Sequence, residues 1–203
     1  MAPYTAIADV SETLLGILQD RFSATEGAAT MDAETVALVA PDAVSEESST
    51  RLSLSLYRFE ENLSMKNTDL NQGGDPNVSE GSPLALDLYY LLTAYPVGTD
   101  DDETTQTIDQ QRLLGLAMQT FHDNAVLDGE QLHDSLDPDV NLSISLVNSS
   151  IEELSTLWTT VPNTAFQPSA LYHVGPVLID SRQREEITPV TDRETAVDRT
   201  PDN

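Results

Sequence analysis

The chain contains no cysteine, and Lys66 is the one lysine among its nine basic residues. Without cysteine it forms no disulfide bond and offers no thiolate as a metal ligand or nucleophile. No segment reaches the ~20 apolar residues that cross a bilayer. The first residues, MAPYTAIADVSETLLG, lack the basic start and apolar run of a secretory signal. We therefore expect a cytoplasmic protein with no membrane partner.

Acidic residues dominate the composition, with 35 against nine basic residues and a net charge of −26. Each quarter of the chain holds between seven and ten of them, which argues against an acidic tail and against one localised patch that mimics DNA. An evenly acidic surface is typical of proteins in molar salt, where the Debye length falls to about 3 Å and charge repulsion is screened. We expect a halophilic archaeal source with a high-salt cytoplasm, so the acidity gives no clue to function.

The 203 residues are enough for one domain, or one domain with an arm. Hydrophobic periodicity and turn residues predict the elements. In chain order they are a helix at 5–22, strands at 34–41 and 51–59, a mobile loop at 60–83, a strand at 84–96, a helix at 99–124, a strand at 140–147, a short helix after 148 and a strand at 169–180. This order predicts an α/β (α+β) fold, a mixed sheet packed with helices over 1–182, with an extended polar arm at 183–203.

The stretch LALDLYYLLTAYP, residues 84–96, is compatible with a helix or a strand. A helix would place Asp87 on its apolar face. A strand places the alternate residues from Leu84 to Leu92 in one apolar row, with a mixed row opposite, and prolines bracket the stretch. We therefore predict a strand, central in the sheet because both of its faces are largely apolar.

Three local features accompany the later elements. In the 99–124 helix, Thr107 and Gln110 have capping-box spacing, and Gly115 suggests a close backbone approach. The predicted buried positions are Leu114, Met118, Phe121 and Ala125 in this helix, and Val140, Leu142, Ile144 and Leu146 in the next strand.

The last third of the chain has two overlapping capping boxes and one proline with structural meaning. The boxes are Ser149 with Glu152 and Ser150 with Glu153. Pro176 lies within a predicted strand, where it cannot donate to the ladder, so it marks an edge strand or a bulge.

The sequence contains no recognisable catalytic or ligand-binding motif. Its three histidines, His122, His133 and His173, are scattered without zinc-site spacing. The acidic run TDDDE fits a helix start better than a calcium loop. Phosphate-binding glycine loops, nucleophile elbows and basic patches are absent. We expect no enzyme, no cofactor, no metal and no nucleic-acid partner.

Four stretches together resemble a known family. They are RLSLSLYRFEEN, LALDLYYLLTAY, QRLLGLAMQTFHDNAVL and SIEELSTLWTTVPNTAFQPSALYHVGPVLID. Their order and spacing resemble the N-terminal domain of the cap proteins of extracellular contractile injection systems, the tail-terminator-like proteins of virulence-cassette and antifeeding-prophage particles. The resemblance covers about residues 5–182. Its framework positions are Leu86, Asp87, Tyr90, Leu92, Tyr95, Leu114, Gly115, Leu157, Trp158 and Tyr172.

The resemblance implies structural work rather than chemistry. It implies a twisted mixed sheet flanked by helices, and a homohexameric ring that closes the inner tube and anchors the last sheath layer at the end distal to the baseplate. The tube and sheath proteins are then partners, in a particle that the cell can release. Two alternatives remain: a tail terminator of a haloarchaeal contractile-tailed virus, and an acidic monomeric binding protein that mimics nucleic acid.

The C-terminal arm and the long loop are the expected contact segments. The arm could add a strand to a neighbour's sheet edge, and it carries arginines suited to acidic partners. The candidate interface residues are Arg182, Arg184, Arg193 and Arg199 in the arm, with Lys66 and Asn67 in the loop.

Overall fold

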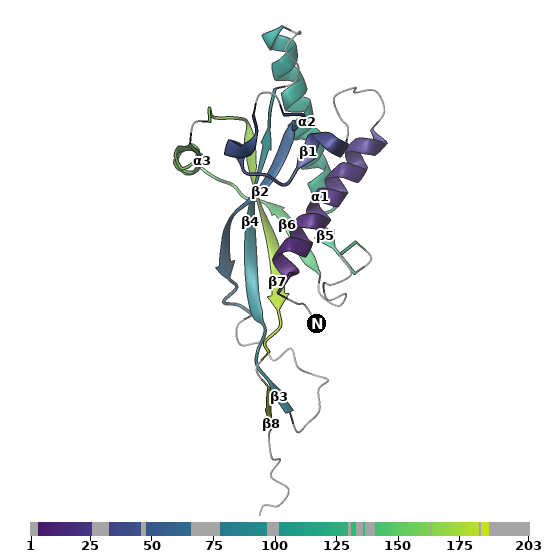
Figure 1. Cartoon of the computed structure of the whole chain (residues 1–203), viewed down its shortest axis with the longest axis vertical. Coiled ribbons are helices and arrows are strands. Elements are labelled where there is room, and N and C mark those ends of the chain that lie inside the picture. Colours follow the sequence, from purple (N-terminus) through teal and green to yellow (C-terminus); the bar gives the residue numbers. More distant parts are fainter. Residues whose placement is uncertain are drawn as a thin grey trace, which may run out of the picture.

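The computed structural model describes residues 4–25, 33–45, 48–65, 78–96, 102–129, 131–132, 136, 141–162, 164–182 and 184–186, the side chains of 78–80 and 184–186 excepted. The predicted class is confirmed, because a mixed sheet is packed with helices (Figure 1). The elements are α1 (Ala6–Ala24), η1 (Ala33–Thr35), β1 (Val36–Ala37), η2 (Pro41–Ala43), β2 (Leu52–Glu61), β3 (Val78–Glu80), β4 (Leu84–Ala94), α2 (Glu103–Asp123), β5 (Val126–Leu127), β6 (Leu142–Leu146), α3 (Ile151–Thr159), β7 (Ser169–Ile179) and β8 (Arg184–Glu186).

Six strands form the main sheet in the order β1-β2-β4-β7-β6-β5. The β1–β2 pair is parallel and the other pairs are antiparallel, so the sheet is mixed. Helices α1 and α2 lie on one face of this sheet and α3 lies on the other (Figure 1). Strands β3 and β8 form a separate two-stranded ribbon beyond one end of the sheet.

The ambiguous stretch at 84–96 is a central strand, as predicted. β4 pairs with β2 on one side and with β7 on the other. Leu88, Tyr90 and Leu92 of its apolar row are fully buried in the main core, whereas Leu84 at the start of the strand is exposed. Leu91 and Thr93 on the opposite row are also buried, whereas Asp87 and Tyr89 of that row are only partly buried.

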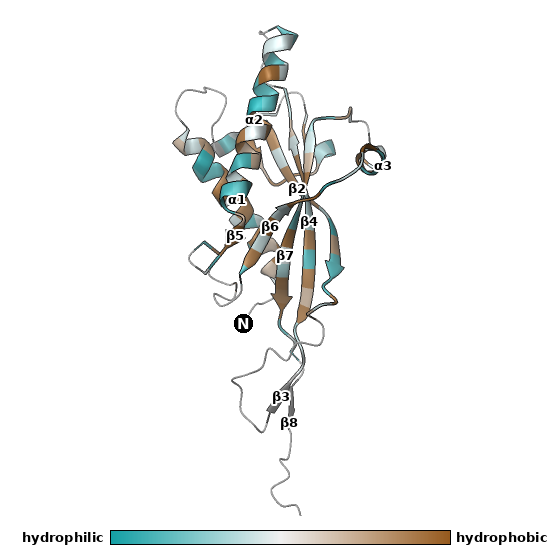
Figure 2. Cartoon of the chain, turned by 180° about the vertical axis from the view of Figure 1, so that it is seen from behind, coloured by the Kyte–Doolittle hydropathy of each residue, from teal (hydrophilic) through white to brown (hydrophobic). Residues whose placement is uncertain are grey.

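The core lies between α1, α2 and the sheet. Val10, Leu14 and Leu18 of α1 follow helical spacing and are buried against the strand residues. Figure 2 shows the hydrophobic residues along β4 and β7 and a mixture of both kinds on the helices. Burial of each such leucine stabilises the fold by roughly 1.5–3 kcal/mol, so this layer holds α1 to the sheet.

Pro176 marks a bulge rather than an edge. β7 is an internal strand, between β4 and β6. The register shifts there, since Leu86 pairs with Val177 whereas Leu88 pairs with Val174. Between these pairs, Gly175 and Pro176 of β7 stand opposite Asp87 alone. Pro176 therefore belongs to a bulge, where the missing N–H of proline breaks no ladder bond.

The expectations for α2 are wrong in three respects. The helix begins at Glu103, where the Asp102 carboxylate accepts hydrogen bonds from the amide N–H groups of the next turn, so Thr107 lies inside the helix and does not cap it. Gly115 is exposed, and a methyl group in place of its Hα would meet nothing within 4 Å, so no backbone approaches it. The buried residues are Gln110, Leu113, Ala117, Thr120 and Phe121, so that only Phe121 of the predicted stripe belongs to them.

The physical reason for the shifted face of α2 is a buried polar side chain. The Gln110 amide donates hydrogen bonds to the Ala94 carbonyl oxygen, at 2.7 Å, and to the Gln167 side-chain oxygen, at 2.8 Å. These bonds satisfy the amide group and allow it to face the core. A purely apolar pattern cannot identify such a position.

Other predicted boundaries also change. Of the strand predicted at 34–41, only Val36–Ala37 pairs as a strand, between two short 3-10 turns. Strand β2 continues to Glu61, and residues 78–80 pair with 184–186, so both ends of the 60–83 loop contain strand. In β6 the side chain of Leu146 is 48% exposed rather than buried, and Val140 lies outside the described residues.

Candidate functional site: two open sheet edges

The two outer strands of the sheet cover only part of their neighbours. β1 pairs with β2 at Leu52 and Ser53 alone, so no described strand pairs with the outer side of residues 54–60. At the other side, β5 pairs with β6 at Leu142 and Ser143, and the Ile144 amide donates to the Ala125 carbonyl oxygen. Beyond that point, no described strand covers β6. We call residues 54–57, before the Arg58–Glu60 ion pair, the β2 edge, and residues 145–149, the end of β6 with the segment that follows it, the β6 edge.

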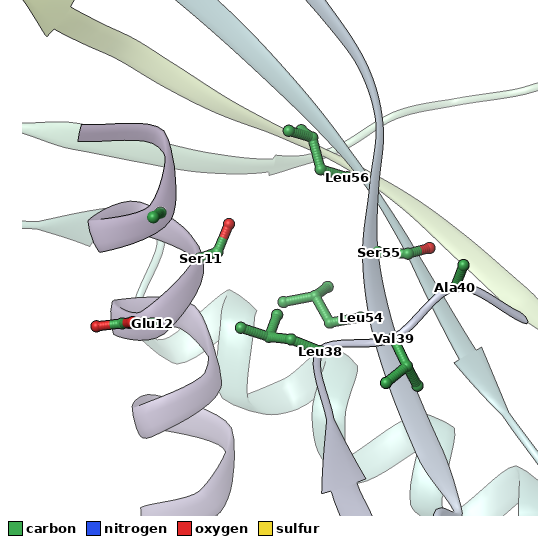
Figure 3. A pocket seen from close by; sticks show the side chains of 9 residues that line it. Ser11, Glu12, Leu38, Val39, Ala40, Leu54, Ser55 and Leu56 are labelled. Carbon is green, nitrogen blue, oxygen red and sulfur yellow. The ribbon is translucent and has the colours of Figure 1, made fainter. Parts of the chain in front are cut away.

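A groove lies beside the β2 edge, between α1 and the sheet (Figure 3). Its volume is about 390 Å³. The lining residues are Ala8, Ser11, Glu12, Leu38, Val39, Ala40, Leu54, Ser55 and Leu56. In Figure 3 the side chains of Leu38 and Leu54 lie side by side between the helix and β2, which makes the groove largely apolar.

The one hydroxyl of α1 in this groove has its partners inside the protein. Ser11 Oγ donates to the Ile7 carbonyl oxygen at 3.0 Å and lies 2.7 Å from the Tyr90 hydroxyl. Because the single hydroxyl hydrogen of Ser11 is used on Ile7, the Tyr90 hydroxyl is the donor in the second bond. Burial raises the pKa of Tyr90 to about 12. This pair fixes α1 to β4 beside the groove and offers no reactive group.

A second groove lies beside the β6 edge, between α2 and the sheet. Its volume is about 590 Å³. The residues lining it are Met118, Gln119, Phe121, His122, Ala125, Ile144, Ser145, Leu146 and Tyr172. Phe121 and Tyr172 pack edge to face with ring centroids 4.9 Å apart, and burial raises the pKa of Tyr172 to about 12. This groove is also apolar, and half-exposed Leu146 forms its border at the strand edge.

A polar row that the sequence did not suggest crosses the opposite face of the sheet. Strand register places Arg58, Tyr89, His173 and Ser145 side by side on β2, β4, β7 and β6. The Arg58 guanidinium lies 4.6 Å from the Tyr89 ring centroid, and the Tyr89 and His173 rings are 5.3 Å apart. Asp87 adjoins the row, with its Oδ1 3.0 Å from His173 Nε2. Strand alternation predicts the shared face, but the sequence alone does not determine the register between strands.

In space, Ser145, His173 and Asp87 follow one another as the serine, histidine and aspartate of a hydrolase triad do. Their geometry does not support that chemistry. Ser145 Oγ lies 3.4 Å from His173 Nδ1, which is long for a hydrogen bond involving a hydroxyl. Asp87 Oδ1 is also the acceptor for the Asn62 amide at 3.1 Å. Neither groove is lined by His173 or Asp87. The row therefore works as a cross-strand contact that joins four strands.

The described residues contain no metal-binding cluster and no membrane span. Among them, no group of three or more histidine, cysteine or acidic side chains is placed to hold a metal ion. No helix within the described ranges has the length and apolar character needed to cross a bilayer.

Five of the framework positions of the resemblance form one buried cluster, and the other five lie at three separate places. Leu86, Tyr90, Leu92 and Tyr172 are in the main core, and Tyr95 is buried with its hydroxyl 3.0 Å from Ser53 Oγ. The structure brings these five together on adjacent strands. The others are dispersed: Asp87 in the polar row, Leu114 and Gly115 on α2, and Leu157 and Trp158 on α3.

Trp158 is the buried anchor of α3. Its ring centroid lies 5.5 Å from that of Phe166, and its side chain is 6% exposed. Its indole Nε1 is buried without a hydrogen-bond partner among the described residues. The helix itself starts with the Ser150–Glu153 capping box, which confirms one of the two predicted boxes, whereas Ser149 and Glu152 do not form one.

The predicted interface residues lie mainly outside the described part of the chain. Arg182 is exposed after β7, and Arg184 starts β8, of which the backbone alone is described. Arg193, Arg199, Lys66 and Asn67 are outside the described residues. Their role as contacts therefore stays a prediction.

Two solved structures have a similar fold. One is the sheath/tube terminator of an extracellular contractile injection system, PVC, in its extended state, with a TM-score of 0.64, 18% identity and coverage of 99% of this chain and 66% of that one. The other is the tube-terminating cap of the anti-feeding prophage, AFP, with a TM-score of 0.57, 19% identity and coverage of 94% and 61%. The present chain thus spans somewhat less than two thirds of the length of these proteins. No curated protein matches it in sequence.

The sequence family follows from a match over most of the chain. The model of the Pvc16 N-terminal domain matches residues 9–193. This range begins in the first turns of α1 and extends past β8, so it includes both open edges and, apart from Ala8, the residues that line both grooves. The chain belongs to the Pvc16 N-terminal domain family.

Proposed function

We propose that this chain is the cap of a contractile injection particle. As a homohexameric ring it ends the inner tube and anchors the last sheath layer at the end distal to the baseplate. The observation that carries the proposal is the family match over residues 9–193. The similar folds of a sheath/tube terminator and a tube-terminating cap support it. It acts inside an assembled particle, with the tube and sheath proteins as its partners.

The grooves and open edges support assembly rather than catalysis. Both grooves are lined mainly by apolar side chains beside unpaired strand edges. Such surfaces suit contacts with extended protein segments, because an edge strand has free backbone donors and acceptors. In the first groove Ser11 is bonded to the Ile7 carbonyl oxygen and the Tyr90 hydroxyl, and neither is a base that activates a nucleophile.

The first experiment is the solution mass of the purified protein in molar KCl, by light scattering behind a sizing column, with negative-stain images of the peak. We expect about six times the chain mass of 22.1 kDa and a ring with a central hole. A monomer that stays a monomer after addition of the particle's tube protein would contradict the cap and favour the acidic binding protein. A ring bound to a capsid-bearing tail would instead indicate the virus terminator.

We also propose that the C-terminal arm contacts the sheath or a neighbouring subunit. The base of the arm is β8, which pairs with β3 in the same chain. A truncation after Glu186 therefore removes the rest of the arm, with Arg193 and Arg199, and keeps this ribbon. We expect the truncated protein to form the ring and to lose sheath attachment in a co-sedimentation assay. Full attachment after truncation excludes the arm.

A further inference from the structure

The two open edges carry no charge in a strongly charged chain. Charged residues make up 22% of the sequence. Yet residues 52–57 of β2, LSLSLY, and residues 142–149 through the β6 edge, LSISLVNS, contain none. Proteins usually place charges on exposed edge strands to prevent edge-to-edge pairing. Their absence from both edges indicates that the edges are covered when the protein works.

The two edges lie at opposite ends of one row of residues that crosses the sheet. Strand register aligns Leu56, Tyr90, Tyr172 and Leu146 across β2, β4, β7 and β6. Three successive antiparallel pairings relate β2 to β6, so the two strands run in opposite directions. Each edge adjoins an apolar groove on the face that carries α1 and α2. When the strands of a neighbouring copy run in the same directions as those of the first copy, the β2 edge of the neighbour lies antiparallel to the β6 edge of the first.

We propose that the β6 edge of one copy pairs with the β2 edge of the next copy. The inference rests on the proposed ring and specifies how it is built: the sheet of each subunit continues into the sheet of its neighbour. Two different edges that pair head to tail make a heterologous contact, which gives a ring when the rotation between successive copies closes. Pairing of one edge with itself would stop at a dimer and leave the other edge open.

Charge identifies a second copy as the partner. Each copy has a net charge of −26, so copies repel one another wherever their acidic surfaces meet. Contact through the two uncharged edges, residues 54–57 and 145–149, buries no acidic side chain of either edge, and Glu60 farther along β2 is paired with Arg58. The grooves add apolar area around Leu54 and Leu146 on the two sides of the contact.

Cysteine cross-linking tests the pairing directly, because the natural chain has no cysteine. Ser55 and Ser145 both lie on the face opposite α1 and α2, one at each edge. The experiment treats S55C/S145C full-length protein with a short bismaleimide, which bridges direct and diagonal neighbours across a strand pair. We expect a ladder of covalent species up to the hexamer. The single variants S55C and S145C should give almost none, since each cysteine faces a serine.

The outcomes separate this inference from the proposed function. Strong dimers from either single variant overturn it in favour of a self-pairing edge. A ring that gives no ladder of cross-linked species overturns the edge pairing and leaves the proposed cap function intact. A protein that stays monomeric in the presence of tube protein overturns both proposals. Cross-links that form to added tube or sheath protein, and not between copies, identify another occupant and also overturn it. The variant S55C/S155C, with its second cysteine on exposed α3, sets the background.

A charge placed at the edge gives an independent test. Leu146 is 48% exposed, so L146K leaves the monomer folded by circular dichroism. We expect it to weaken ring formation about tenfold or more, because the pairing would bury an unpaired ammonium group. Ile108 on α2 is 43% exposed and lines neither groove, so I108K is the matched control. Equal assembly of the two variants overturns the pairing.

Discussion

Gly175 has less space for an added methyl group than Gly16 or Gly115. A Cβ there would lie 2.5 Å from Asp87 Oδ1, which is held by Asn62 and by His173. We expect Gly175→Ala to lower the free energy of unfolding by about 1–3 kcal/mol, because the carboxylate must leave its partners. Chemical denaturation in molar KCl measures the change.

The control for that substitution is another glycine in open surroundings. A Cβ at Gly115 meets nothing within 4 Å, and the residue is inside α2. Gly115→Ala should raise the stability by about 0.5–1 kcal/mol, because alanine loses less backbone entropy in a helix. If the two variants change stability alike, the crowding at Gly175 has no energetic consequence.

Tyr90 makes the free energy of unfolding depend on pH in the alkaline range. The unfolded chain loses the tyrosine proton near pH 10, whereas the folded chain keeps it until about 12, because burial raises the pKa of Tyr90. The contribution is therefore complete below pH 10 and is lost as the pH rises to 12. We expect Tyr90→Phe to cost about 1 kcal/mol at neutral pH through the lost bond to Ser11.

The same variant should flatten the alkaline profile. Between pH 10 and 12, its unfolding free energy should fall more slowly than that of the wild type, by up to about 1.4 kcal/mol per pH unit. Denaturation curves at several pH values measure both slopes. Parallel profiles would show that Tyr90 titrates equally in the folded and unfolded chains.

At the scale of elements, the start of α3 distinguishes two caps that the sequence made equally plausible. Ser150 Oγ accepts a hydrogen bond from the Glu153 amide, and the Glu153 carboxylate accepts one from the Ser150 amide. Ser150→Ala should lower stability by about 1 kcal/mol. Ser149→Ala is the control and should have little effect. Thermal unfolding compares the two, and a reversed order would place the helix start one residue earlier.

Sequence reasoning predicted the elements whose side chains satisfy one period without exception. The apolar row of β4 identified a central strand, and the alternation of leucine and serine in LSLSL identified β2 as a strand. It failed where a polar group is satisfied inside the core, as at Gln110, and where pairing joins distant residues, as in the β3–β8 ribbon. The edges and grooves were not predicted for the same reason. An edge is defined by where a neighbouring strand stops, and β1 and β5 are only two residues long.

At the scale of the whole molecule, the charge predicts a dependence on salt. With a net charge of −26, repulsion within the folded chain is strong when the Debye length is long. We expect the thermal midpoint to rise steadily from about 0.05 M to molar KCl, as the Debye length falls to about 3 Å. Sodium chloride should have the same effect, since screening depends on ionic strength. A midpoint that does not change with salt would contradict the adaptation inferred from the composition.

Strand β7 determines how the molecule bears a pulling force. Its end at Ile179 leads through a short connection to Arg184, the first residue of β8, and from there to the C-terminal arm. A load on the arm therefore enters the body along β7, which is held by β4 on one side and β6 on the other. Its ladder bonds lie across the direction of pull, so they must shear together instead of opening one after another. A sheath that contracts while attached to this arm would pull on a strand that is held by ladders on both sides.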